Sequence, residues 1–141
     1  MKRVGARLAR RGHEAGAAAV EFAIVLPMLC VLLFGIVAYG GYFWIAHAVQ
    51  QLANDSARAA VAGLDDTERQ GLAQASLTSG LATYAYLKPS AAQLSMTNQD
   101  QELAITVAYD AAGSPFWSLS GLIPMPPTLI RRQAVVRLGG Y

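Results

Sequence analysis

The stretch that decides the fold is Ala17–Val49, AAAVEFAIVLPMLCVLLFGIVAYGGYFWIAHAV. From Phe22 through Asn54 no side chain carries a formal charge, with histidine taken as neutral. Because a helix needs about 20 consecutive apolar residues to cross a bilayer, we expect a transmembrane span from about Phe22 to Trp44. The far end of this span carries the aromatic residues that gather at a membrane interface: Tyr39, Tyr42, Phe43 and Trp44.

Basic residues are crowded before this span. The chain has 11 Lys/Arg and 9 Asp/Glu. Five of the basic residues, but only Glu14 of the acids, lie within residues 1–16, so the remainder is slightly acidic. A basic flank next to an apolar span stays on the cytoplasmic side. The basicity therefore indicates membrane topology, and we expect no nucleic-acid partner.

The helix is expected to continue beyond the membrane. Small and apolar residues recur at helical spacing between Ile45 and Ala62, which predicts one helix over Ala17–Ala62 with Gly63 as a left-handed C-terminal residue. On its exposed face, Asp55 and Arg58 are spaced to pair. The expected buried face consists of Val49, Leu52, Ser56, Ala59 and Ala60.

A second helix is expected after a short break. Asp65 and Glu68 have the spacing of a capping box, which predicts a helix that starts at Asp66. Its apolar stripe contains Leu77, Leu81 and Tyr84. We expect the helix to extend to Leu87, because Lys88-Pro89 follows and proline cannot continue a helix.

Beyond Pro89 the apolar period changes from 3.6 to two, which is typical of strands. A hairpin is predicted from a strand around Leu94 and Met96, a turn at residues 98–101 and a strand over Leu103–Tyr109. A third strand is predicted over Leu129–Leu138, with Arg132 interrupting its apolar face.

The predicted fold class is therefore α+β, with a long N-terminal transmembrane helix that continues into a small head containing a second helix and a three-stranded antiparallel sheet. The expected organisation is a basic leader over 1–16, the transmembrane and extended helix over 17–63, and the α+β head over 64–141.

Gly16–Glu21, GAAAVE, has the form G-x-x-x-x-E between the basic leader and the apolar helix. This arrangement resembles type IV prepilins. Gly16–Gly35, followed by YGGYFW and NDSARAAVAG, is similar to the TadE-like minor pilins, or pseudopilins, of tight-adherence (Flp) pilus systems. The resemblance implies that a prepilin peptidase cleaves the Gly16–Ala17 bond on the cytoplasmic face.

The same resemblance implies a minor pilin that takes part in assembly of a Flp-type pilus. Its implied partners are the prepilin peptidase, the major Flp pilin, other minor pilins, the inner-membrane assembly platform and the lipid bilayer. It implies a single-pass protein of the bacterial inner membrane, with a periplasmic or extracellular head. Major pilins usually have tyrosine after the glutamate, so Phe22 favours a minor pilin. The expected packing residues of the helix are Glu21, Phe22, Pro27, which also predicts a kink, and Gly35.

Glu21 is the acid at the edge of the span. A carboxylate there costs roughly 2–4 kcal/mol unless it is paired. The resemblance implies that it pairs with the α-amino group that cleavage creates at Ala17. The alternative is a glutamate that snorkels to the cytoplasmic interface.

The apolar loop of the head has two interpretations that stay open. Its residues could form an exposed patch for a partner pilin, or they could fold back and cover the small sheet. The residues concerned are Phe116, Trp117, Leu119, Leu122 and Ile123.

The sequence shows no catalytic constellation, so we expect no enzyme, no cofactor and no metal site. Cys30, the single cysteine, lies inside the apolar run, and no histidine follows His47. The alternative function is an uncleaved, signal-anchored envelope module that binds a ligand through residues 111–127 and is unrelated to pili.

Overall fold

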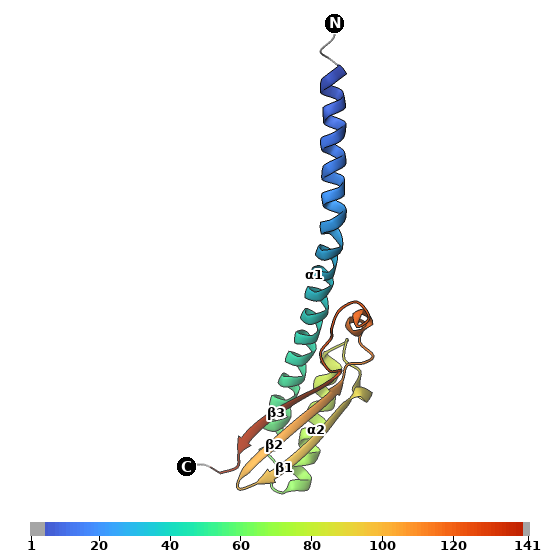
Figure 1. Ribbon diagram of the computed structural model, residues 1–141. Helices are drawn as coiled ribbons and strands as arrows, with labels where there is room; N and C mark the ends of the chain where they lie inside the picture. Colours follow the sequence, from blue (N-terminus) through green and yellow to red (C-terminus); the bar gives the residue numbers. More distant parts are fainter. Residues whose placement is uncertain (1–4, 140–141) are drawn as a thin grey trace. The chain divides into compact units, whose positions relative to one another are not determined.

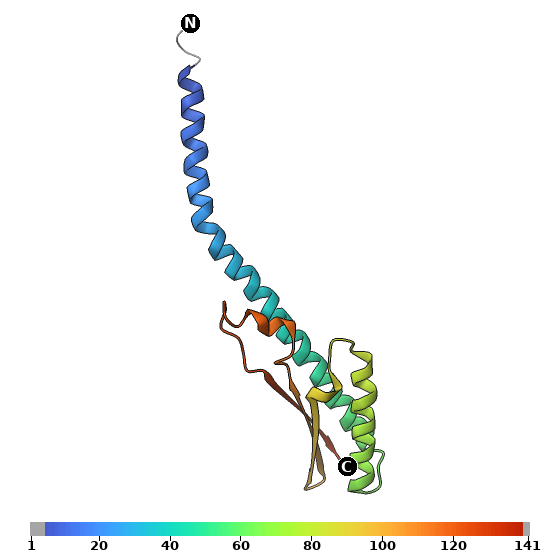
Figure 2. The same ribbon diagram turned by 90° about the vertical axis from the view of Figure 1, so that its right-hand side faces the viewer.

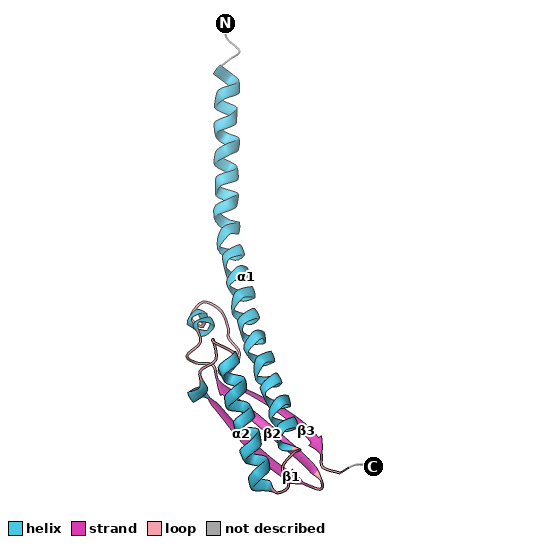
Figure 3. Cartoon of the chain, turned by 180° about the vertical axis from the view of Figure 1, so that it is seen from behind, coloured by secondary structure: helices cyan, strands magenta, loops and turns pink. Residues whose placement is uncertain are grey.

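A computed structural model describes residues 5–139 and has the predicted α+β fold (Figures 1 and 3). The elements follow one another as α1 (Gly5–Ala60), α2 (Asp66–Thr83), the short 3-10 helix η1 (Pro89–Ala91), β1 (Ala92–Gln99), β2 (Glu102–Asp110), the 3-10 helix η2 (Pro115–Leu119) and β3 (Leu129–Arg137).

The chain divides into two compact units, and the division falls inside α1. The first unit is Met1–Val37 and the second is Ala38–Tyr141. The outer part of α1, from Ala38 to Ala60, therefore belongs to the same compact body as α2 and the sheet. We refer to this second unit as the head.

The head has two layers. Its sheet is antiparallel in the order β1-β2-β3, and the outer part of α1 and α2 cover one face of it (Figure 2). The central strand β2 alternates as predicted, and its apolar residues face the helices. Ile105 lies opposite Met96 of β1 and Ala134 of β3. The buried residues of β2 are Leu103, Ile105, Val107 and Tyr109.

The outer part of α1 forms the centre of the core. Val49, Leu52, Ser56 and Ala60 are buried as predicted, and Ala59 is half-buried. Small side chains allow close approach of neighbouring elements. Gly80 of α2 shows this, because a Cβ atom there would lie 2.5 Å from Cδ2 of Leu52. The further small buried residues of α1 in this core are Ala46, Ala48, Ala53 and Ala57.

The start of α2 confirms the predicted cap. The carboxylate of Asp65 accepts a hydrogen bond from the backbone N–H of Glu68 at 2.8 Å. The carboxylate of Glu68 accepts in turn from the N–H of Leu64 at 2.7 Å, one residue before the cap. Both bonds satisfy donors that would otherwise be free at the turn into α2.

The end of α2 differs from the prediction. The helix stops at Thr83, four residues before Leu87, and Tyr84 has extended backbone angles. The physical reason is packing: Leu87 is buried in the core, and the backbone N–H of Lys88 donates to the hydroxyl of Tyr109 at 3.0 Å. A helix continued to Leu87 would make neither contact.

Three details at the end of α1 differ from the prediction. The helix ends at Ala60, and Gly63 does not have a positive φ. Glycine is needed there for close approach, because a Cβ atom would lie 2.7 Å from the backbone nitrogen of Arg69. Asp55 and Arg58 do not pair, and the ion pairs among the described residues are Arg69–Asp66 and Arg137–Glu102.

Strand β3 ends at Arg137, one residue earlier than predicted, and Arg132 lies on its helix-facing side. The side chain of Arg132 is half-buried, and its Nη1 donates to the carbonyl of Arg131 at 3.1 Å. This interruption of the apolar face is tolerated because β3 is an edge strand, where a long side chain can reach solvent.

The hairpin between β1 and β2 has a tighter turn than predicted. Both strands continue to the pair Gln99–Glu102, which leaves only Asp100 and Gln101 in the loop. These two residues have φ of 50° and 66°. Such a two-residue loop favours Asn-Gly because both positions need positive φ.

Replacing Gln101 by glycine is expected to stabilise the head by about 1 kcal/mol, because a side chain in the left-handed region costs roughly that much. The measurement is thermal unfolding of the detergent-solubilised chain, followed by near-ultraviolet circular dichroism. Gln99→Gly is the control, and should destabilise because Gln99 lies in regular strand. A lower midpoint for Gln101→Gly than for the parent protein would contradict this account of the turn.

Candidate processing site and packing surfaces

The candidate processing residues lie on α1 in the first unit. Gly16, Ala17 and Glu21 are all exposed. Because α1 begins at Gly5, the Gly16–Ala17 bond is helical. A protease that binds extended backbone would have to unwind this turn. Gly16 makes unwinding easier, because glycine is about 1 kcal/mol less favourable than alanine inside a helix.

Part of the basic leader lies outside the described residues. This applies to Lys2 and Arg3, and no side chain before Gly16 is described. The expected cytoplasmic anchor therefore stays a prediction from the sequence.

The remainder of the first unit exposes apolar side chains on all sides of the helix. From Val20 to Val37, the exposed fraction of the large apolar side chains runs from 40% at Leu26 to 74% at Met28. The apolar window has a mean hydropathy of 2.6, and none of it is buried. A helix that is apolar all round needs apolar surroundings. This segment of α1 is long and apolar enough to cross a membrane.

The predicted packing residues are part of this exposed surface. Phe22 is exposed, α1 continues through Pro27, and Gly35 is half-buried with open space where a Cβ would be. Glu21 lies one residue before Phe22 and is also exposed. These positions are therefore available to a neighbouring helix, and their role in packing stays a prediction.

The apolar loop of the head folds onto α1. Trp117 and Ile123 are buried, Phe116 and Leu119 are half-buried, and Leu122 is 66% exposed. The ring of Trp117 meets that of Tyr42 edge to face, with centroids 6.1 Å apart. Most of the large apolar side chains of the loop thus pack inside the head, and Leu122 is the main one that is exposed.

Three contacts hold the loop in place. The hydroxyl of Tyr39 donates to the carbonyl of Pro124 at 2.8 Å. The indole N–H of Trp117 donates to the carbonyl of Pro126 at 3.2 Å. The ring of Phe116 lies against Gly41, where a Cβ atom would be 2.3 Å from the ring.

Sequence reasoning missed an aromatic cluster beside this loop. Trp44 of α1 packs edge to face on Tyr86, with centroids 5.4 Å apart, and Tyr86 packs likewise on Tyr84. Burial raises the pKa of the Tyr86 hydroxyl, and the Trp44 side chain acts against this rise. The only local signal was the Tyr84–Tyr86 pair beyond the helix, and it does not indicate a partner on α1.

An open groove of about 680 Å³ lies between α1 and β3. Phe43, Trp44 and His47 line it from α1, and Arg132 lines it from the sheet. Gln50 stands at its edge and donates from its side-chain amide to the carbonyl of Gln133 at 3.2 Å. The groove therefore combines exposed aromatic rings with the guanidinium group of Arg132 and the imidazole of His47.

Gly41→Ala is expected to destabilise the head by about 1–3 kcal/mol, because the added methyl group overpacks the contact with Phe116. Thermal unfolding and the fluorescence of the buried Trp117 measure the effect. Gly40→Ala is the matched control, since nothing lies within 4 Å of a Cβ there. Equal effects of the two substitutions would show that the loop does not need the close contact.

Comparison with protein families found a match to the N-terminal helix. A family model described as TadE-like protein matches residues 16–58. The match begins at the glycine of the G-x-x-x-x-E motif and ends in the last turn of α1, so it covers the exposed apolar segment and the helix of the head core. Comparisons with curated proteins and with solved structures found no match. Residues 16–58 are thus similar to the TadE-like family, as the sequence resemblance predicted.

Proposed function

We propose that this chain is a minor pilin, or pseudopilin, that takes part in assembly of a Flp-type (tight-adherence) pilus after a prepilin peptidase cleaves Gly16–Ala17. One observation carries the proposal. The TadE-like match starts at Gly16, on a helix whose side chains up to Val37 are, apart from Glu21, apolar and almost all exposed. Such a helix has to be covered by lipid or by other helices.

The mechanism we propose is packing. The exposed apolar segment of α1 from Phe22 to Val37 has a length of about 24 Å at ~1.5 Å per residue, which is most of a bilayer core of about 30 Å. The same length can leave the membrane and pack in a helical bundle with major pilin. The head begins at Ala38, so it leaves this segment free for neighbours.

Glu21 gives this bundle a register. After cleavage the new α-amino group at Ala17 lies four residues, or about 6 Å along the helix axis, from Glu21. If Glu21 of one subunit pairs with the amino group of the next, the two helices are offset by about this distance. Pairing also removes the cost of an isolated carboxylate in apolar surroundings.

The head has a directing role in this proposal. It stays on the far side of the inner membrane, opposite the basic leader, and it blocks or directs growth of the fibre when α1 enters the bundle. We propose no catalytic role, and the work of the protein is done through its contacts with the peptidase, other pilins and the assembly platform.

The alternative, an uncleaved anchored module that binds a ligand through residues 111–127, has less support. Trp117 and Ile123 of this loop are buried, and Phe116 is held against Gly41. A ligand would have to displace these contacts or bind the exposed part of the loop, in which Leu122 is the main large apolar side chain.

The mature N-terminus tests the proposal. Intact mass of the protein from membranes that contain a prepilin peptidase should correspond to a chain that starts at Ala17. Gly16→Leu should abolish processing, because a side chain at this position obstructs the extended backbone in the peptidase. Gly12→Leu, the same change one helical turn earlier, should be processed normally. A mature protein that keeps Met1 would overturn the proposal in favour of the anchored module.

A further inference from the structure

The head contacts α1 before the apolar run of the helix has ended. Ala38 is fully buried, and Tyr39 holds the loop through its bond to Pro124. The exposed aromatic residues Phe43 and Trp44, each 63% exposed, come later along the helix. The head therefore covers part of α1 at the level where an interfacial aromatic belt is expected.

The length of α1 also indicates that the head begins near the membrane interface. A hydrocarbon core of about 30 Å takes ~20 helical residues. Counted from Phe22, the first residue after the acid, this length ends near Gly41. If α1 crosses a membrane with Phe22 at one edge of the hydrocarbon, the residues that the loop contacts, Tyr39 and Gly41, are near the other edge.

The surface of the head at this level is apolar and aromatic. We name it the proximal surface, and it lies at the end of the head where the chain enters at Ala38, beside the η2 loop (Figure 1). Tyr86 is 44% exposed and packs on Trp44, while Leu122 is two residues from the carbonyl that Tyr39 binds. The proximal surface consists of Tyr39, Phe43, Trp44, Tyr86 and Leu122.

The loop that carries Leu122 is suited to surroundings poor in water. From Ala111 to Ile130 no side chain is charged. Four of its residues are prolines and have no N–H to satisfy. The indole N–H of Trp117 and the hydroxyl of Tyr39 both donate to carbonyls of this loop. Polar groups that are satisfied internally make immersion in the membrane less costly.

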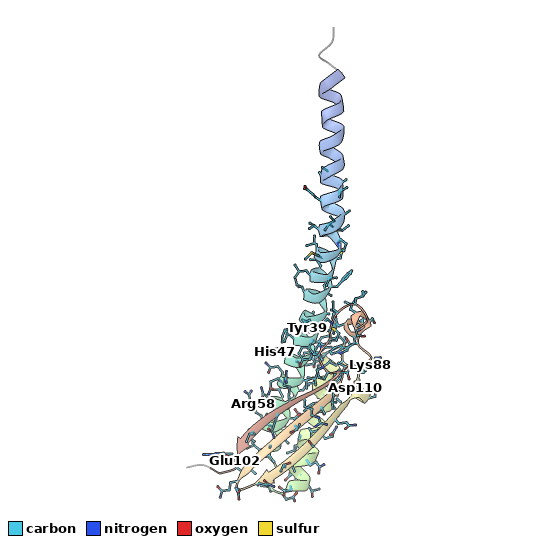
Figure 4. The ribbon with its side chains drawn as sticks, viewed as in Figure 1. Tyr39, His47, Arg58, Lys88, Glu102 and Asp110 are labelled. Atoms are coloured by element: carbon cyan, nitrogen blue, oxygen red, sulfur yellow. The ribbon has the colours of Figure 1, made fainter. Side chains whose placement is uncertain are left out.

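Charged side chains occur at both ends of the head. Lys88 and Asp110 lie at the same end as Tyr39 and His47, whereas Glu102 lies at the opposite end, where it pairs with Arg137 (Figure 4). Arg132 lines the groove beside Trp44 and His47. The acids of the α2 cap are on the far side, and Asp66 there binds Asn98 near the hairpin turn at 2.8 Å. Basic side chains close to a membrane are attracted to anionic headgroups.

We propose that the proximal surface is immersed in the phospholipid headgroup layer on the side of the membrane that holds the head. The head then lies against the bilayer instead of standing away from it on a helical stalk. The proposal requires only that α1 crosses a membrane, so it holds whether or not the chain enters a pilus. The bilayer also retains the subunit, because the loop has to leave the headgroup layer before α1 can be withdrawn.

Site-specific fluorescence in a defined bilayer tests the proposal. The full-length chain with Cys30→Ala carries a single cysteine, Leu122→Cys or Leu64→Cys, labelled with an environment-sensitive fluorophore. Leu64 is the matched control, as an exposed loop leucine (88%) beside the far-end cap. The protein is placed in nanodiscs of phosphatidylethanolamine and phosphatidylglycerol, one chain per disc. Quenching is measured with lipids that carry a nitroxide on the headgroup.

We expect the label at Leu122 to emit further to the blue and to be quenched by the headgroup nitroxide, and the label at Leu64 to show neither effect. Tyr86→Cys should behave like Leu122→Cys, which covers the case in which one labelled variant misfolds. Equal spectra and equal quenching at 122 and 64 would overturn the proposal. A blue shift at 122 that appears only with several chains per disc, and without quenching by the headgroup nitroxide, would also overturn the proposal. A second copy of the chain would then cover the surface.

Discussion

The helix α1 has one segment that is exposed and one segment that is packed in the core of the head, and the rest of the structure depends on this difference. From Phe22 to Val37 its side chains are mostly large, apolar and exposed. From Ala38 onward the buried face is mostly alanine, with Ile45, Val49 and Leu52 as the larger members. The size of the side chains therefore changes within a single helix. Large apolar side chains suit contact with lipid or other helices, and small ones suit close packing in a protein core.

The small residues of the second segment determine how the head is built. Glycine allows close approach on both sides, because Leu52 of α1 packs over Gly80 of α2 and the ring of Phe116 in the η2 loop packs over Gly41 of α1. The sheet then closes the other side with the apolar residues of β2. The buried residues of α1, α2, the sheet and the η2 loop therefore form one hydrophobic core.

Local patterns predicted much of this architecture, and contacts between distant segments account for what they missed. The alternation of Leu103–Tyr109 and the Asp65–Glu68 cap are local signals, and both were correct. The end of α2 was wrong because the burial of Leu87 and the bond to Tyr109 depend on the sheet. The role of Gly63 was wrong for a similar reason, since its neighbour is Arg69.

The candidate site also has a part that local sequence patterns predicted and a part that they did not. The motif that begins at Gly16 and the apolar segment after it were recognisable from residue types alone, and the family match agrees with them. Residue types alone did not predict which loop residues remain exposed. The packing of Phe116 on Gly41 and of Tyr86 on Trp44 joins residues that are far apart in the sequence.

The central claim is that the exposed segment of α1 packs among pilin helices and that Glu21 finds a counter-charge there. The most direct measurement is the amount of this protein in fibres sheared from cells that express Glu21→Ala, with Glu14→Ala as control, because Glu14 would be removed with the leader. The account predicts that Glu14→Ala is recruited like the parent protein and that Glu21→Ala is processed but absent from the fibres. Normal recruitment of Glu21→Ala would contradict it.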